Sequence, residues 1–164
     1  MDGEAEDVKI RELLAKIRQE AYDLHVYLGT GLLEKVYENG LCHRLKQAGL
    51  KVEVQQPLKV YDSDGFCLGE YFADLVVEDK VIVELKAVKC IASEHYAQIL
   101  NYIKITGAPA GLLINFGSYK FEVRTVIPHS NVENSRVENS RVENSRVENS
   151  RVENSRVENS RVEV

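Results

Sequence analysis

The chain has 164 residues, a formal net charge of -5 at pH 7 and a hydrophobic content of 44%. This composition is typical of a globular protein, and the acidic balance argues against a general nucleic-acid coat, whose affinity would need a basic surface. No apolar run is long enough to span a bilayer, and the acidic start MDGEAEDVKIRE does not resemble a secretory signal. Three scattered cysteines argue against a disulfide framework. We therefore expect a cytoplasmic protein that does not enter a membrane.

The end of the chain is a repeat. The unit NSRVE occurs six times from Asn134 to Glu163, and its arginines and glutamates balance, so residues 1–133 carry the whole charge of -5. Val, Asn and Ser are poor helix formers, and a period of five matches neither a helix nor a strand. We therefore expect one folded domain over residues 1–130 and a disordered tail over residues 131–164.

Two helices are predicted at the start of the chain. Apolar residues recur at helical spacing over residues 7–28, and Gly29-Thr30-Gly31 ends this pattern. A second helix is expected over about residues 32–47, with Gly49 after its end. The residues expected to face the interior are Val8, Ile10, Leu13, Leu14, Ile17, Ala21, Leu24 and Val26 in the first helix, and Leu32, Val36, Tyr37, Leu41 and Leu45 in the second.

After residue 50 the apolar pattern changes to a period of two, which predicts strands. The expected strands cover residues 51–61, 66–77, 81–87, 111–116 and 120–127, and a third helix covers residues 93–106. Pro57 marks the first strand as an edge strand or a bulge, and its residues expected to be buried are Val52, Val54, Leu58 and Val60. The order ααβββαββ predicts an α/β (α+β) fold in which helices flank a central mixed sheet.

Charged residues interrupt the apolar stretch ADLVVEDKVIVELKA at residues 73–87. Glu84 and Lys86 share one face of the expected strand over residues 81–87, about 7 Å apart. A three-residue hairpin loop at 78–80 would place Asp74 directly opposite Glu84, whereas a loop of even length would put them on opposite faces. Facing carboxylates repel each other, and a hard divalent ion such as Mg²⁺ would compensate. The alternative interpretation is a Glu/Lys pair on a half-exposed edge strand.

The predicted helices carry further polar candidates. Gln98 and Tyr102 are four residues apart and share a face of the third helix, while Glu34 and Tyr37 share a face of the second. An amphipathic helix with a polar shoulder would explain the first pair, and an acid near a helix N-terminus is common and mildly stabilising. Of the four histidines, His95 is the one expected near these residues.

Taken in order, these segments resemble a nuclease superfamily. An acid on a helix, then Asp, then Glu-x-Lys on a strand pair, then a helix with Gln-x-x-x-Tyr is similar to the PD-(D/E)xK pattern. The segments GLLEKVY, FADLVVEDKVIVELKA, AQILNY and GLLINFG resemble its small GxxExxY family over about residues 8–127. The resemblance implies a restriction-endonuclease-like fold and a metal-dependent nuclease, a hydrolase that cuts DNA or RNA with a metal-activated water.

The resemblance also implies the site residues, which are Asp74, Glu84, Lys86, Glu34, Gln98 and Tyr102. Asp74, Glu84 and Glu34 would hold Mg²⁺ or Mn²⁺. Lys86 would orient the attacking water, and Gln98 with Tyr102 would position the substrate strand or the site. Ala73 stands where the pattern often has proline, and three cysteines cannot supply the four that bind an iron–sulfur cluster in some relatives.

Nucleic acid is the partner that the resemblance implies, and a homodimer is expected because relatives of this fold often pair. The alternative function is a catalytically silent nucleic-acid-binding or assembly module, which the acidic charge and small size favour. A third interpretation is a metabolic or structural domain with a coincidental motif, although the sequence has no P-loop or GxGxxG to support another chemistry. The sequence leaves open DNA or RNA, and ends or interior.

Overall fold

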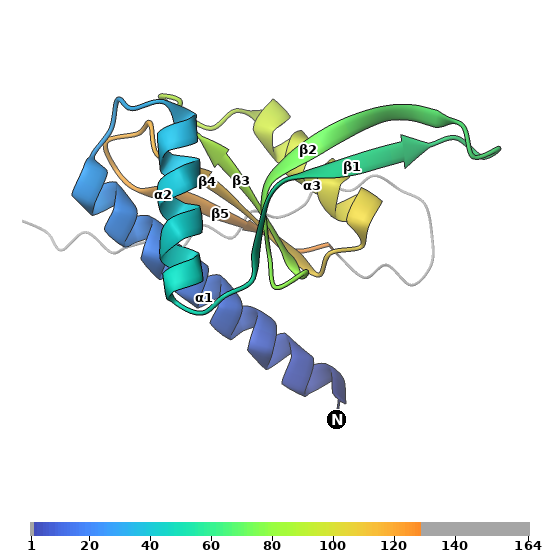
Figure 1. The fold of residues 1–164 in the computed structure, drawn as a ribbon, viewed down its shortest axis with the longest axis horizontal. Coiled ribbons are helices and arrows are strands. Elements are labelled where there is room, and N and C mark those ends of the chain that lie inside the picture. The colour runs from blue at the N-terminus through green and yellow to red at the C-terminus, as the bar shows by residue number, and fades with distance from the viewer. Residues whose placement is uncertain (1, 129–164) are drawn as a thin grey trace, which may run out of the picture. The chain divides into compact units, whose positions relative to one another are not determined.

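The computed structural model describes residues 2–128. The helices are α1 (Asp2–Leu28), α2 (Glu34–Gln47) and α3 (Ser93–Thr106), and the strands are β1 (Val52–Tyr61), β2 (Cys67–Val77), β3 (Val81–Lys86), β4 (Ala110–Asn115) and β5 (Glu122–Val126). Their order along the chain is the predicted ααβββαββ (Figure 1). Residues 131–164 lie outside the described residues, so the disordered tail and the domain boundary stay predictions.

The five strands form one mixed sheet in the order β1-β2-β3-β4-β5. The pair β3–β4 is parallel and the other three pairs are antiparallel. A parallel pair needs a long crossover, and α3 provides it between β3 and β4. β1 lies at an edge of the sheet, as Pro57 predicts. The predicted fold class is therefore confirmed.

Helices cover both faces of the sheet. α1 and α2 pack on one face, where Ile17, Leu41 and Leu75 belong to a continuous buried core. α3 packs on the other face, where Ile99 and Leu113 belong to a second core. Each such aliphatic side chain stabilises the fold by about 1.5–3 kcal/mol when buried. Among the described residues, none of the helices is long and apolar enough to cross a membrane.

Some residues predicted to face the interior are exposed instead: Val8 by 51%, Val26 by 65%, Leu32 by 41%, Val36 by 41% and Val54 by 37%. The buried stripe of α1 runs from Ile10 to Leu24. Val8 and Val26 lie two residues beyond its ends, which turns them about 200° away from it. α2 begins at Glu34, so Leu32 precedes the helix instead of packing from it.

The β2–β3 hairpin has the register that a three-residue loop predicts. The paired residues are Leu75 with Val83, Val76 with Ile82, and Val77 with Val81. Glu78 and Asp79 close the loop with φ of 54° at both residues. In the same register, Asp74 is next in line opposite Glu84. The loop length therefore sets which side chains meet at the end of β3.

Candidate active site

Glu84 and Lys86 form an almost buried ion pair at the end of β3. Glu84 is 1% exposed, and Lys86 Nζ donates a hydrogen bond to Glu84 Oε1 at 2.5 Å. The other oxygen, Oε2, is buried and has no hydrogen-bond partner within the described chain. Leaving a buried polar atom without a partner costs about 1–3 kcal/mol. A cation or a polar ligand at Oε2 would remove that cost.

Asp74 brings a second carboxylate from β2. Its Oδ2 accepts a hydrogen bond from the Leu85 N–H at 2.8 Å, and its Oδ1 accepts one from Gln55 Nε2 at 3.2 Å. These two bonds orient the carboxylate, and its charge acts on Glu84. Two neighbouring strands therefore present acids to one place.

α2 adds a third acid at its first residue, Glu34. The loop before it is held by Tyr37, whose hydroxyl donates to the Gly29 carbonyl at 2.8 Å and accepts from the Leu32 N–H at 3.2 Å. Gly31 in this loop has φ of 95°, which residues with a side chain rarely adopt. The Gly-x-x-Glu-x-x-Tyr segment thus fixes the start of the helix, and Glu34 lies close enough to interact with the charges of Lys86 and Asp74.

The crowding of carboxylates around one lysine shifts their pKa values. Burial, with the charge of Asp74 next, raises the pKa of Glu84 to about 7. Burial also raises the pKa of Asp74 and that of Glu34, which is more exposed than the other two acids. Desolvation alone would lower the pKa of Lys86, but the hydrogen bond and charge of Glu84 outweigh it and raise that pKa. Acids whose pKa values rise together mark a place that is short of positive charge.

Glu38 and Gln55 also belong to this cluster, although the sequence patterns did not reveal them. Glu38 is 4% exposed and accepts hydrogen bonds from Lys35 Nζ and from Gln55 Nε2, the latter at 2.6 Å. Gln55 therefore bridges Glu38 of α2 and Asp74 of β2. It does so with φ of 51°, which costs a non-glycine residue about 1–3 kcal/mol. The QQP segment, which breaks the alternation of β1, is the signal in the sequence.

α3 brings Gln98 and Tyr102 to the same region. Gln98 Nε2 donates a hydrogen bond to the Tyr102 hydroxyl at 2.8 Å. Tyr102 is 4% exposed, burial raises its pKa, and it interacts with the charges of Glu84, Asp74 and Lys86. At the start of the helix, His95 Nδ1 accepts a hydrogen bond from a backbone N–H at 3.1 Å. His95 therefore caps α3 through this nitrogen.

Asn115 ties together the loops that follow β3 and β4, and it too was not evident from the sequence patterns. This fully buried residue accepts hydrogen bonds from the Val88 N–H at 3.1 Å and the Gly117 N–H at 3.0 Å. Its amide donates to Glu122 Oε2 at 3.2 Å. At Gly117 a Cβ would lie 2.3 Å from the Val88 nitrogen, so the two loops touch through their backbones. This contact fixes the chain directly after Lys86.

The profile of the PD-(D/E)XK nuclease superfamily matches residues 11–126. The chain belongs to the PD-(D/E)XK nuclease superfamily. Among solved structures it is similar to the crystal structure of SSO0001, with 18% identity and a TM-score of 0.47 over 66% of this chain. The chain spans 56% of the length of SSO0001, and no curated protein matches it.

Nucleases of the PD-(D/E)XK superfamily generally use divalent metals, and the donors present fit such an ion. Mg²⁺ is usually bound through one or two carboxylates with water completing its shell. Asp74 and Glu84 supply two carboxylates, and Glu84 Oε2 is an acceptor without a partner. Across residues 2–128, no three His, Cys, Asp or Glu side chains are grouped as a ready metal cluster. The trio Asp74, Glu84 and Glu34 therefore stays a prediction.

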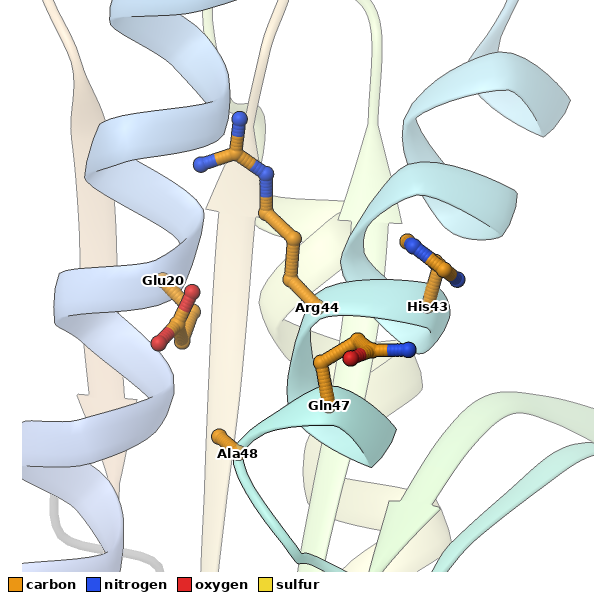
Figure 2. A pocket seen from close by; sticks show the side chains of 5 residues that line it. All are labelled: Glu20, His43, Arg44, Gln47 and Ala48. Carbon is orange, nitrogen blue, oxygen red and sulfur yellow. The ribbon is translucent and has the colours of Figure 1, made fainter.

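A groove between α1 and α2 lies apart from these acids. It is lined by Glu20 of α1 and by His43, Arg44, Gln47 and Ala48 at the end of α2 (Figure 2). None of the six predicted site residues lines it. The groove is therefore separate from Asp74, Glu84 and Glu34.

Proposed function

We propose that this superfamily member is a metal-dependent nuclease that hydrolyses phosphodiester bonds of DNA or RNA. The observation that carries the proposal is the buried Glu84 carboxylate, which has one oxygen on Lys86 and one without a partner, beside Asp74. A cluster that is rich in acids and short of positive charge suits a cation and a phosphate. The segment Gly31-x-x-Glu34-x-x-Tyr37 supports a place in the GxxExxY family.

Asp74 and Glu84, completed by Glu34, would hold Mg²⁺ or Mn²⁺. When bound, the ion supplies positive charge beside the phosphate and lowers the pKa of water. Lys86 stays protonated because its pKa is raised. It therefore acts as a hydrogen-bond donor to a phosphate oxygen or to the attacking water, and does not remove a proton from either. Gln55 keeps the Asp74 carboxylate oriented through its hydrogen bond.

In this proposal, Gln98 and Tyr102 of α3 help to hold the substrate strand. The Gln98 amide fixes the Tyr102 hydroxyl oxygen, so the tyrosine O–H remains free to donate toward the acids or a phosphate. A substrate strand held by this pair would have its phosphate oriented before the chemical step. Such orientation lowers the barrier because less freedom is lost on reaching the transition state.

Cleavage assays test the proposal directly. The purified full chain is incubated with single- and double-stranded DNA and RNA in Mg²⁺, in Mn²⁺ and in EDTA. We expect cleavage with either ion and none in EDTA, and a loss of about 100-fold or more in rate for both Glu84→Gln and Lys86→Ala. Glu20→Gln, in the groove between α1 and α2, is the matched control and keeps the rate of the unaltered chain. Cleavage that is absent, or that survives both site substitutions, contradicts the proposal.

A catalytically silent nucleic-acid-binding or assembly module is the second candidate. The contacts of Lys86, Gln55 and Leu85 already engage three of the four carboxylate oxygens of Asp74 and Glu84. The net charge of -5 also disfavours strong attraction to phosphates. Calorimetric titration with Mn²⁺ separates the candidates. Binding that Glu84→Gln abolishes supports the nuclease, whereas no binding by the unaltered chain favours the silent module.

A further inference from the structure

Two loops follow β3 and β4 and continue directly from the candidate site. The first covers residues 87–92 and the second covers residues 116–121. Because β3 and β4 are parallel neighbours, both loops leave the same edge of the sheet (Figure 1). Lys86, whose Nζ pairs with Glu84, is the residue directly before the first loop. These two segments are called the paired loops.

Hydrogen bonds hold the paired loops against each other. The Phe116 N–H donates to the Lys86 carbonyl at 2.7 Å. Asn115 Oδ1 accepts from the Val88 N–H at 3.1 Å and from the Gly117 N–H at 3.0 Å, and this asparagine is fully buried. The first loop is therefore fixed to the second at the point where the chain leaves Lys86.

The second loop is also anchored to α1. His25 is 8% exposed, and its Nε2 lies 3.0 Å from the Ser118 carbonyl oxygen. A carbonyl oxygen only accepts hydrogen bonds, so this nitrogen carries a proton and donates it. The same ring packs against Phe116 and Phe121. A ligand would therefore meet loops that are already ordered, and less conformational freedom would be lost on binding.

The paired loops are basic, unlike the chain as a whole. They contain Lys89 and Lys120, both exposed, and no acidic residue, whereas the whole chain has 26 acidic residues and 21 lysines and arginines. Neither lysine forms an ion pair with an acid of residues 2–128, although the nearby Arg124 pairs with Glu122. The paired loops thus offer two uncompensated positive charges to an anionic ligand.

The position of these charges indicates which anion they suit. Lys89 is three residues after Lys86, so their Cα atoms are at most about 11 Å apart. A nucleic-acid strand carries a negative charge on every nucleotide. A strand with one phosphate at Lys86 therefore brings its next phosphates to the paired loops.

We propose that the paired loops bind the phosphates that flank the cleaved bond, through Lys89 and Lys120. The inference rests on the proposed nuclease function and specifies its substrate class, a strand with phosphates beyond the reacting one. Lysine binds phosphate as a point charge, and contacts to phosphate carry no base information. Binding at the paired loops is therefore independent of base sequence, and the strand runs from the acids toward β5.

An acidic surface on a second copy of the chain is the competing occupant. The two lysines contribute +2 to the net charge of -5, so the rest of the chain carries -7 and has acids to offer. A copy seated on the paired loops would, however, lie directly beside Lys86 and hinder a polymeric substrate. Continuity with the candidate site therefore favours nucleic acid.

Fluorescence anisotropy with the full chain in EDTA, where cleavage is withheld, tests the inference. The probes are a labelled oligothymidylate and the same strand annealed to oligoadenylate, each titrated at several salt concentrations. For Lys89→Gln combined with Lys120→Gln, we expect the affinity for both probes to fall about 10-fold at low salt. The slope of log affinity against log salt should become shallower by about 1.4 for the single strand and about 1.8 for the duplex, because fewer counterions are released.

Lys9→Gln combined with Lys46→Gln is the matched control, because it removes the same charge from two exposed positions. Lys9 of α1 lines a pocket with Lys80, at the end of β3 opposite Lys86, and Lys46 lies in the last turn of α2. The control pair should keep the slope of the unaltered chain. Equal losses in the two double variants would show that net charge alone governs binding, and would overturn the inference.

Two further readouts separate phosphate contact from structural support of the site. Lys89→Arg combined with Lys120→Arg keeps both charges and should keep the slope. In cleavage assays, the double glutamine variant should raise KM and leave kcat unchanged, because contacts away from the reacting phosphate bind substrate and transition state equally. Exposed lysines contribute little to folding, so its thermal midpoint should match that of the unaltered chain. A lower kcat with an unchanged KM would show that the loops merely support Lys86.

The remaining outcomes distinguish this inference from the nuclease proposal. Binding that depends on the two lysines, without cleavage in Mg²⁺ or Mn²⁺, supports the paired loops and contradicts the nuclease. Cleavage whose KM is indifferent to both lysines supports the nuclease and overturns the inference. If the double glutamine variant changes the sedimentation coefficient and not the affinity for the probes, the paired loops bind a second copy and the inference fails. No binding of either probe by the unaltered chain overturns it as well.

Discussion

At the scale of single residues, Glu84 dominates the electrostatics of the site. It is 1% exposed, has one oxygen on Lys86 and one without a partner, and faces the charge of Asp74. Burial and this neighbouring charge raise its pKa to about 7, so the carboxylate gains a proton within the range in which proteins are usually handled. The stability of the fold should therefore depend on pH through this residue.

The free energy of unfolding should fall as the pH rises from 4.5 to about 7, because of Glu84. In this window the folded chain retains a proton that the unfolded chain, with the ordinary pKa of 4.5, has lost. The full shift corresponds to a loss of roughly 3 kcal/mol at high pH. Urea unfolding in EDTA across this range should show a steeper fall for the unaltered chain than for Glu84→Gln. Parallel curves for the two chains would contradict the prediction.

A substitution at Gln55 distinguishes a role in positioning Asp74 from a role in stabilising the fold. Gln55→Gly relieves the φ of 51° but removes the bridge between Glu38 and Asp74. We expect an unfolding free energy that is unchanged or higher by about 1 kcal/mol, and cleavage that is slower by about 10-fold or more. Gln56→Gly is the control, because the neighbouring Gln56 has no positive φ, and its free energy of unfolding should fall by about 1 kcal/mol. If Gln55→Gly loses stability and activity together, the residue is simply structural.

At the scale of elements, local features were predictable and contacts between distant segments were not. The bounds of α3 followed from the Gly107-Ala108-Pro109 stop, and the β2–β3 register followed from a three-residue loop. Both depend on neighbours in the sequence. The Gln55–Glu38 bridge and the role of Asn115 depend on how α2 and two loops pack against the sheet. Apolar spacing alone does not specify that packing.

Substitutions at two glycines test how tightly the elements around the site are packed. A Cβ at Gly117 would lie 2.3 Å from the Val88 nitrogen, whereas one at Gly111 would lie 2.8 Å from Ile99 Cδ1, the end of a side chain that can move. We expect Gly111→Ala to lower the free energy of unfolding by about 1–2 kcal/mol and Gly117→Ala to lower it by about 3 kcal/mol or more. The second cost is larger because backbone atoms cannot move aside as easily as the end of a side chain. Gly117→Ala should also slow cleavage, since it displaces the chain after Lys86.

Urea unfolding measures both costs. Gly69→Ala is the control, since nothing lies within 4 Å of a Cβ at that position, and it should stay within about 0.5 kcal/mol of the unaltered chain. Equal losses at Gly111 and Gly117 would show that the two loops separate readily, and Lys86 would then be less firmly held than the structure indicates.

At the scale of the whole molecule, an acidic protein has to approach an acidic polymer. The net charge of -5 disfavours strong non-specific attraction, so under the proposed function recognition would depend on the few cations at the site and on a bound metal ion. A homodimer would extend the surface in contact with nucleic acid, and it stays a prediction that sedimentation at several protein concentrations can check. Because few contacts are available, it matters whether the repeat tail contributes to binding.

We predict that a chain ending at residue 130 behaves like the full chain. Both buried cores lie within residues 2–128, and the six arginines and six glutamates of the repeats cancel, so ending the chain at residue 130, which also removes Glu133, changes the net charge only from -5 to -4. The thermal midpoint, the cleavage rate and the salt dependence of strand binding should therefore be the same for both chains. A lower midpoint for the short chain would show that the tail stabilises the domain. A weaker salt dependence would show that the tail arginines contact phosphates, because fewer counterions would then be released on binding.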